Sequence, residues 1–214
     1  MKKIILLILV FTIVFLIYTF NINKKIYYLS AGDYLSYGID NLGNTINGYS
    51  NNIKNKYRGK LGNYVNYSFV EDYKVMDLIN DITYNRDVNY NGKNYKLQNL
   101  LIKSNLITIS IGMNDLIYKK NITYEYVDNL LDDIDRLLVY IRKYNKDKIF
   151  FIGFYNIINN KDIIEYANKR LENICNKNSV NFVDITNLED YFDGLYPKKE
   201  GYLYISNKII NFTK

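Results

Sequence analysis

Two stretches of the sequence place polar side chains directly after short apolar runs. Residues 26–31 are followed by Gly32 and Asp33, and residues 106–111 are followed by the stretch 112–115. Each run has the length and bounding residues of a buried strand. In an open parallel sheet, ligands bind at the carboxyl ends of the strands, near the point where the strand order reverses. These polar residues therefore predict a functional site at that edge of a sheet.

The composition removes the commonest catalytic base from such a site. The chain contains no histidine and one cysteine. Without an imidazole, a serine triad has no base with a pKa near neutral, and zinc sites that need imidazole are excluded. A single cysteine, Cys175, excludes an internal disulfide and a multi-cysteine metal site, and its helical neighbourhood predicts a core thiol. The sequence predicts neither a metal nor a cofactor.

Three stretches of the chain resemble the conserved blocks of one enzyme family. The stretch 32–36, Gly-Asp-Tyr-Leu-Ser, resembles the Gly-Asp-Ser-Leu block that opens the SGNH (GDSL) hydrolases, which are small esterases and lipases. The stretch 112–115 resembles their Gly-x-Asn-Asp block. The stretch 193–202 resembles their Asp-Gly-x-His-Pro block followed by Gly-Tyr, and Pro197, the only proline of the chain, falls where that block has one.

The resemblance also marks where this chain departs from the family. Tyr34 stands where the family has its catalytic serine, and Tyr196 stands where it has histidine. The best register places Asp72 at the family's oxyanion-hole glycine. Asn114 matches the asparagine that donates to the developing oxyanion, and Asp193 matches a triad carboxylate that here has no imidazole to orient.

Several roles remain open for these residues. Asn114 can stabilise an oxyanion, or Asn114 or Asp115 can cap the following turn, and Asp193 can be an ordinary loop or cap carboxylate. The tyrosines can contact a ligand, or they can pack to seal the former pocket. The predicted pocket consists of Gly32, Asp33, Tyr34, Ser36, Gly112, Asn114, Asp115, Asp193 and Tyr196.

Two functional hypotheses follow, and the sequence does not decide whether the chain is an enzyme. The favoured one is a catalytically inactive SGNH-like pseudoenzyme that binds a lipid, glycan or protein partner at the cell surface. The alternative is an active ester hydrolase with a displaced nucleophile, such as Ser36 or Ser30, or with direct attack by Tyr34, whose phenol needs activation. A nucleotide-binding module is disfavoured because no glycine-rich phosphate fingerprint follows any strand.

The pattern of apolar residues predicts the elements that position this site. Strands are expected at 26–31, 63–69, 106–111, 149–152 and 180–185, and helices at 75–82, 97–104, 123–144, 163–174 and 202–210. Residues 35–57 are expected to begin a helix and continue as an irregular loop. This alternation predicts an α/β fold, a three-layer α/β/α sandwich with a mostly parallel, flavodoxin-like sheet, which is also the fold that the resemblance implies.

The first 25 residues predict a membrane anchor. Residues 4–20 form a charge-free apolar run of about 17 residues, just long enough to cross a bilayer, and no small-residue cleavage site follows. We therefore expect a signal anchor at 1–25, a single-pass membrane protein, and an SGNH-like domain at 26–214 on the extracellular side. Four of the 28 basic residues flank the anchor, which leaves 24 against 22 acidic ones and no electrostatic case for nucleic acid.

Overall fold

A parallel sheet of five strands forms the centre of the molecule. The computed structural model describes residues 9–12, 24–156, 158 and 160–212. The sheet has the order β2(Leu61–Ser68), β1(Ile26–Gly32), β5(Leu106–Ser110), β6(Lys148–Ile152), β7(Asn181–Val183), and all of its pairings are parallel. The strand order reverses between β1 and β5, which is the flavodoxin-like order expected from the sequence.

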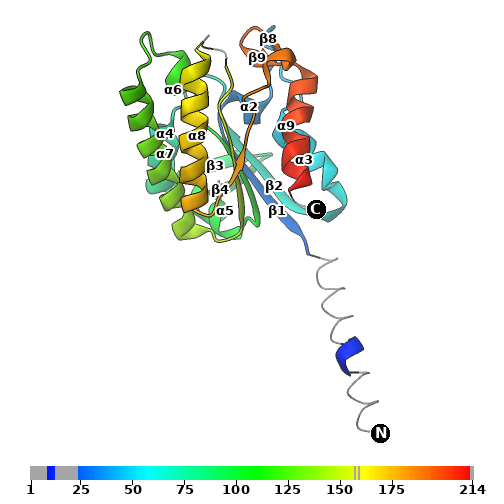
Figure 1. Ribbon diagram of the computed structural model, residues 1–214. Coiled ribbons are helices and arrows are strands. Elements are labelled where there is room, and N and C mark those ends of the chain that lie inside the picture. The colour runs from blue at the N-terminus through cyan, green and yellow to red at the C-terminus, as the bar shows by residue number, and fades with distance from the viewer. Residues whose placement is uncertain (1–8, 13–23, 157, 159, 213–214) are drawn as a thin grey trace.

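Helices cover both faces of this sheet (Figure 1). One layer contains α4(Val75–Thr83), α5(Leu97–Lys103), α7(Tyr124–Tyr144) and α8(Lys161–Lys177). The other contains α3(Tyr49–Lys56) and α9(Lys199–Asn211), which pack on each other. Two short helices, α2(Tyr34–Tyr37) and α6(Met113–Ile117), follow β1 and β5 directly. The predicted three-layer architecture is confirmed.

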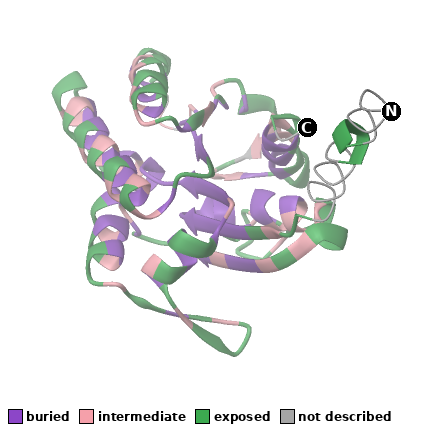
Figure 2. Cartoon of the chain, turned by 90° about the horizontal axis from the view of Figure 1, so that it is seen from below, coloured by how far each residue is buried: buried purple, intermediate pink, exposed green. Residues whose placement is uncertain are grey.

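The burial pattern explains why these elements were readable from the sequence. All five residues of β5 are buried because helices cover both faces of the central strand. On α7, seven apolar side chains spaced three and four apart are buried, and the Thr123 hydroxyl caps the helix by accepting from the Tyr126 amide at 3.2 Å. Figure 2 shows the buried residues gathered in the sheet and on the inner sides of the helices.

Two hairpins were not predicted. Residues 87–96 form the antiparallel pair β3(Asp87–Tyr90) and β4(Lys93–Lys96), joined by Asn91 and Gly92 with φ of 50° and 73°. No apolar pattern in the sequence marks these strands, because the flanking residues are mostly polar and exposed. The second is the short pair β8(Phe192–Asp193) and β9(Tyr196–Pro197). The structure also has two 3₁₀ turns, η1(Arg58–Lys60) and η2(Glu189–Tyr191).

The predicted anchor falls mainly outside the described residues. Of the run at 4–20, the structure describes only residues 9–12, which are helical and in which Leu9, Val10 and Phe11 are exposed. Within the described part of the chain, no helix is long and apolar enough to span a bilayer. Among the described residues, the hydrophobic core and the side chains packed against it all lie from Ile26 onward. Because the described core is contained within residues 26–212, we expect a fragment that begins at Lys24 to fold without the preceding segment.

Candidate functional site

The turn after β1 depends on a close approach between two strands. Gly32 has φ of 135°, and a Cβ at this position would lie 1.8 Å from the carbonyl oxygen of Ser110 on β5. The next amide, that of Asp33, donates to the same carbonyl at 2.7 Å. Only glycine permits this contact and this φ together. Asp33 then caps α2, because its Oδ1 accepts from the Leu35 amide at 3.1 Å.

Tyr34, the residue at the serine position, is enclosed by two other tyrosines. Its side chain is 1% exposed. Its hydroxyl is hydrogen-bonded to that of Tyr155, and its ring makes an edge-to-face contact with Tyr196 at 5.1 Å between centroids. The Tyr155 hydroxyl also lies 3.3 Å from the Leu195 carbonyl, to which it can donate; when it does so, Tyr34 donates to Tyr155. Burial raises the pKa of both Tyr34 and Tyr155, which keeps both phenols protonated.

The third tyrosine enters from the β8–β9 hairpin. Gly194, with φ of 69°, lies in the turn, and Asp193 pairs with Tyr196 across it. The Tyr196 amide donates to Asn41 Oδ1 at 3.0 Å, which fastens the hairpin to the loop after α2. The side chain of Tyr196 is half-buried, and partial desolvation raises its pKa. The Asp193 side chain lies outside what the structure describes, so its predicted role stays a prediction.

Asn114 and Asp115 hold a neighbouring loop. Asn114 is 1% exposed, and its Nδ2 donates to the Tyr73 carbonyl at 3.1 Å. Asp115 Oδ2 accepts from the Val75 amide at 3.3 Å, at the start of α4. Neither side chain caps α6, whose N-cap is Gly112 with φ of 104°. The alternative in which one of these residues caps the following turn is not seen, because the two side chains contact the backbone of Tyr73 and Val75 instead.

Asp72 lies in this loop and points to solvent. Its side chain is 73% exposed and forms an ion pair with Lys74 at 2.7 Å. Its φ of 46° is in the left-handed region, which favours glycine. The backbone at residue 72 therefore has a conformation that suits the glycine which the resemblance places there, but the side chain belongs to a surface ion pair.

Ser30 and Ser36 belong to a buried cluster of hydroxyl groups. Both are fully buried, and their hydroxyls are hydrogen-bonded to each other. Ser36 also donates to Asn66 Oδ1 at 2.9 Å, and Ser30 contacts Thr108 Oγ1 at 2.9 Å. The Tyr49 hydroxyl from α3 adjoins the cluster. These contacts fix the two serines between the sheet and α3, so neither hydroxyl faces solvent as a displaced nucleophile must.

Asp33 carries the most perturbed carboxyl group of the site. It is fully buried, and its Oδ2 has no hydrogen-bond partner among the described residues. Desolvation raises the pKa of this carboxyl to about 7. Asp115 is raised to a pKa of about 6 for the same reason. Within the described chain, no group of three or more carboxylate and thiol side chains could hold a metal ion.

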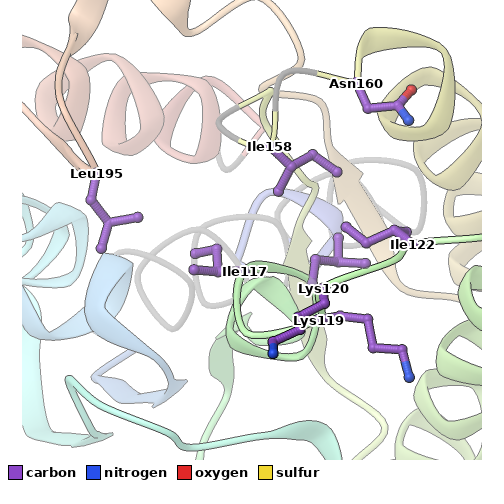
Figure 3. A pocket seen from close by; sticks show the side chains of 8 residues that line it. Ile117, Lys119, Lys120, Ile122, Ile158, Asn160 and Leu195 are labelled. Carbon is purple, nitrogen blue, oxygen red and sulfur yellow. The ribbon is translucent and has the colours of Figure 1, made fainter.

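The structure places Tyr34 and Asn114 after the carboxyl ends of adjacent strands, and described residues enclose the Tyr34 side chain. A cavity of about 340 Å³ lies beside the site and is walled by Ile117, Lys119, Ile122 and Leu195, among others (Figure 3). It includes none of the residues predicted to line the pocket. Sequence analysis missed Tyr155; the available signal was its position shortly after the apolar run 149–152, at the carboxyl end of the next strand.

The arrangement of layers, strand order and polar turns defines an α/β domain of the SGNH hydrolase class of folds. An acetylxylan esterase from Geobacillus stearothermophilus superposes with a TM-score of 0.64 at 15% identity, over 86% of this chain and 92% of that one. A lipase/acylhydrolase from Enterococcus faecalis gives 0.62 at 14% identity, over 88% and 94%. A member of the lipolytic G-D-S-L family from Veillonella parvula gives 0.61 at 12% identity, over 87% and 98%.

These similarities confirm the fold that the sequence resemblance implied. At such low identity they concern the fold and not the activity. No protein-family model matches the sequence, and no curated protein matches it either.

Proposed function

We propose that the chain is an SGNH-fold domain without acyl-transfer chemistry, which binds a lipid, glycan or protein partner at a membrane surface. The observation that carries this proposal is the state of Tyr34. At the position where the resembling enzymes have their serine, it is buried, hydrogen-bonded to Tyr155 and packed against Tyr196. A protonated, enclosed phenol has neither the charge nor the access that a nucleophile needs.

The absence of an imidazole supports the same conclusion. The chain has no histidine, and Tyr196 occupies the corresponding position. The raised pKa of Tyr196 keeps its phenol protonated at neutral pH, so the side chain cannot accept a proton from a nucleophile. Ser36, the alternative nucleophile, donates its proton to the Asn66 amide oxygen, which does not act as a base. Both halves of the nucleophile–base pair are therefore replaced.

A binding role on this fold has a structural counterpart. One similar solved structure is a carbohydrate esterase whose active site displays divergent catalytic and non-catalytic binding functions. It superposes with a TM-score of 0.62 at 12% identity, over 89% of this chain and 69% of that one. We infer that the present chain has kept the scaffold for binding, with the cavity beside Leu195 as one place where a ligand can enter.

We further propose that residues 4–20 anchor the domain in a membrane as a single-pass segment, with the domain on the extracellular side. The support is the charge-free apolar run between Lys3 and Lys24. The anchor would confine a binding domain to partners within reach of the membrane surface.

The test is hydrolysis of short-chain aryl esters by residues 24–214. The natural sequence is expected to release product no faster than buffer. The double variant Tyr34→Ser with Tyr196→His is assayed beside a matched control, Tyr37→Ser with Tyr118→His, which alters two exposed tyrosines. If only the first variant gains activity, the natural domain has kept its substrate pocket and has lost only the nucleophile and the base. Activity in the natural sequence that disappears on Ser36→Ala contradicts the proposal and supports the displaced nucleophile.

A further inference from the structure

One end of the molecule combines the amino ends of the strands with the carboxyl ends of the helices. In a parallel α/β fold the two coincide, because each helix returns the chain to the start of the next strand. Ile26 pairs with Leu61, and Leu106 pairs with Lys148, so these strands begin side by side. This end, at the bottom of Figure 1, lies opposite the candidate site and includes the point where β1 begins.

Basic residues are concentrated at this end, which we call the basic end. It comprises residues 24–26, 54–61, 103–106, 142–149, 177–181 and 208–212. These segments contain one acidic residue, Asp147, and thirteen basic ones: Lys24, Lys25, Lys54, Lys56, Arg58, Lys60, Lys103, Arg142, Lys143, Lys146, Lys148, Lys177 and Lys208. A modest net charge over the whole chain thus hides a strongly asymmetric distribution.

Helix dipoles explain only part of this asymmetry. Basic residues in a last helical turn stabilise the negative end of the helix, and α3, α5, α7, α8 and α9 all have them. Lys24, Lys25 and Lys148, however, lie in or beside strands, and Arg58 and Lys60 lie in a 3₁₀ turn. No α-helix requires a charge at those positions, so helix dipoles do not account for them.

The basic end is also largely unneutralised. Among ion pairs between described residues, Lys177 is its one member with a carboxylate partner, Asp135 at 2.6 Å. Lys56, Lys60 and Lys148 are exposed. An array of exposed cations with so little internal compensation is complementary to an extended anionic surface.

Apolar side chains accompany the cations. Tyr27, Ile102 and Phe212 are 42%, 57% and 59% exposed, and each lies in or beside a segment of the basic end. A cleft of about 600 Å³ opens beside Tyr27, with Lys93, Lys103 and the acidic Asp87 in its lining. Lysines combined with exposed aromatic and aliphatic side chains are typical of protein surfaces that rest at the boundary between lipid headgroups and acyl chains.

We propose that the basic end docks onto a bilayer that carries anionic lipids. A bilayer fits better than a soluble polyanion because the cations spread over the ends of five helices and over nearby strand and turn segments, instead of following one groove, and because apolar side chains are interspersed. Lys24 and Lys25 also lie only three residues beyond the apolar run 4–20 in the sequence. This inference does not depend on the fate of the ester chemistry, and it directs the candidate site away from the membrane.

The test is flotation of residues 24–214 with vesicles, so that the apolar run cannot contribute. Vesicles of phosphatidylcholine are compared with vesicles containing about one-third phosphatidylglycerol, at low salt. One variant carries Lys56→Gln, Lys60→Gln, Lys103→Gln and Lys148→Gln. The matched control carries Lys119→Gln, Lys120→Gln, Lys198→Gln and Lys199→Gln, which removes the same charge from exposed positions near the candidate site.

The domain is expected to float with the anionic vesicles only, and to be released by high salt. Each lysine near an anionic surface contributes about fivefold in affinity, so the basic-end variant should bind at least about a hundredfold more weakly. The control should bind within about threefold of the natural domain. If the variant with four substitutions does not fold, the double variant Lys60→Gln with Lys103→Gln replaces it. Its affinity for anionic vesicles should be about twentyfold lower than that of the natural domain.

Three results would overturn the proposal. One is no binding of the natural domain to anionic vesicles. Another is equal weakening in the two variants, which would mean that net charge and not this face is responsible. The third is binding to soluble polyphosphate without binding to vesicles, which would identify the occupant as a polyanion. Ester hydrolysis by the same preparations is measured separately, so this outcome and that of the proposed function remain distinct.

Discussion

The direction of one hydrogen bond determines how the tyrosines of the site contribute to stability. If Tyr155 uses its proton to donate to the Leu195 carbonyl, Tyr34 must donate to Tyr155. Tyr34→Phe therefore removes a donor and leaves only the Tyr155 oxygen without one of its hydrogen bonds. Tyr155→Phe instead leaves both the Tyr34 hydroxyl and the Leu195 carbonyl without a partner. We expect losses in unfolding free energy of about 1 kcal/mol and about 2–3 kcal/mol respectively, measured by urea denaturation.

The control for these variants is Tyr37→Phe, because Tyr37 is 36% exposed and its loss should cost less than about 0.5 kcal/mol. A larger loss for Tyr34→Phe than for Tyr155→Phe would mean that the chain of donors runs in the opposite direction.

Burial of Asp33 gives the domain a stability that depends on pH. Its pKa is raised to about 7 in the folded protein, against about 4 when unfolded. Between these values the folded state binds more protons than the unfolded state, so stability falls as the pH rises through this window. Three pKa units correspond to about 4 kcal/mol, an upper bound for one group. Asp115, with a pKa of about 6, acts in the same direction.

Asp33→Asn tests this dependence without removing the cap on α2, since the amide oxygen can still accept from Leu35. The difference in unfolding free energy between the variant and the natural domain is expected to grow between about pH 4 and pH 7, in favour of the variant. Denaturant titrations at five pH values measure it. A difference that stays constant over this range would mean that Asp33 titrates near its ordinary pKa.

At the scale of elements, the Arg142 side chain ties the carboxyl end of α7 to two neighbouring segments. Arg142 donates to the carbonyls of Asn178 and Asp147 at 2.9 and 2.8 Å, and so joins α7 to the segments before β6 and β7. Arg142→Gln should lower the unfolding free energy by about 2 kcal/mol, because these partly buried carbonyls lose a charged donor. Lys143→Gln removes the same charge from the next, exposed residue and should cost less than about 0.5 kcal/mol. Similar losses in both would attribute the effect to helix-end charge instead.

The elements that sequence analysis predicted correctly are those in which burial repeats with a clear period. The apolar run of β5 and the stripe of α7 reflect contact with the core, and their residue types follow from it. Asn89 and Asn94, which pair across the β3–β4 hairpin, are exposed, so no apolar pattern marks those strands. Short polar strands are specified by their turn and their partner, and the sequence displays only the turn.

The same reasoning applies to the site. Gly32, Tyr34 and Asn114 could be located because they follow strand ends in a recognisable spacing. The enclosure of Tyr34 could not, because Tyr155 and Leu195 come from distant parts of the chain and meet it only in the folded molecule. Spacing in the sequence reports local structure; whether a side chain is open to a ligand depends on contacts of long range.

At the scale of the whole molecule, charge and topology define one axis. Acidic residues occupy first helical turns near the candidate site, as with Asp77 in α4 and Glu200 in α9, while cations gather at the opposite end. A domain held by an N-terminal anchor and resting on its basic end would present the tyrosine-filled site to the space beyond the membrane. The parallel fold would then determine both where the site lies and how the domain is oriented on the membrane, because it places the site and the cations at opposite ends.

The expected topology can be tested by labelling single cysteines with a membrane-impermeant maleimide in intact bacteria that express the full chain. The natural protein provides a silent background, because Cys175 is fully buried and its thiol pKa is raised to about 12. Tyr118→Cys, at a position 57% exposed near the candidate site, is expected to label in intact cells. Lys3→Cys, which precedes the apolar run, should label only after lysis, because basic residues before a signal anchor favour retention on the cytoplasmic side. The reverse pattern would place the domain inside the cell. If both positions label only after lysis and carbonate extracts the protein, residues 4–20 do not anchor it in the membrane.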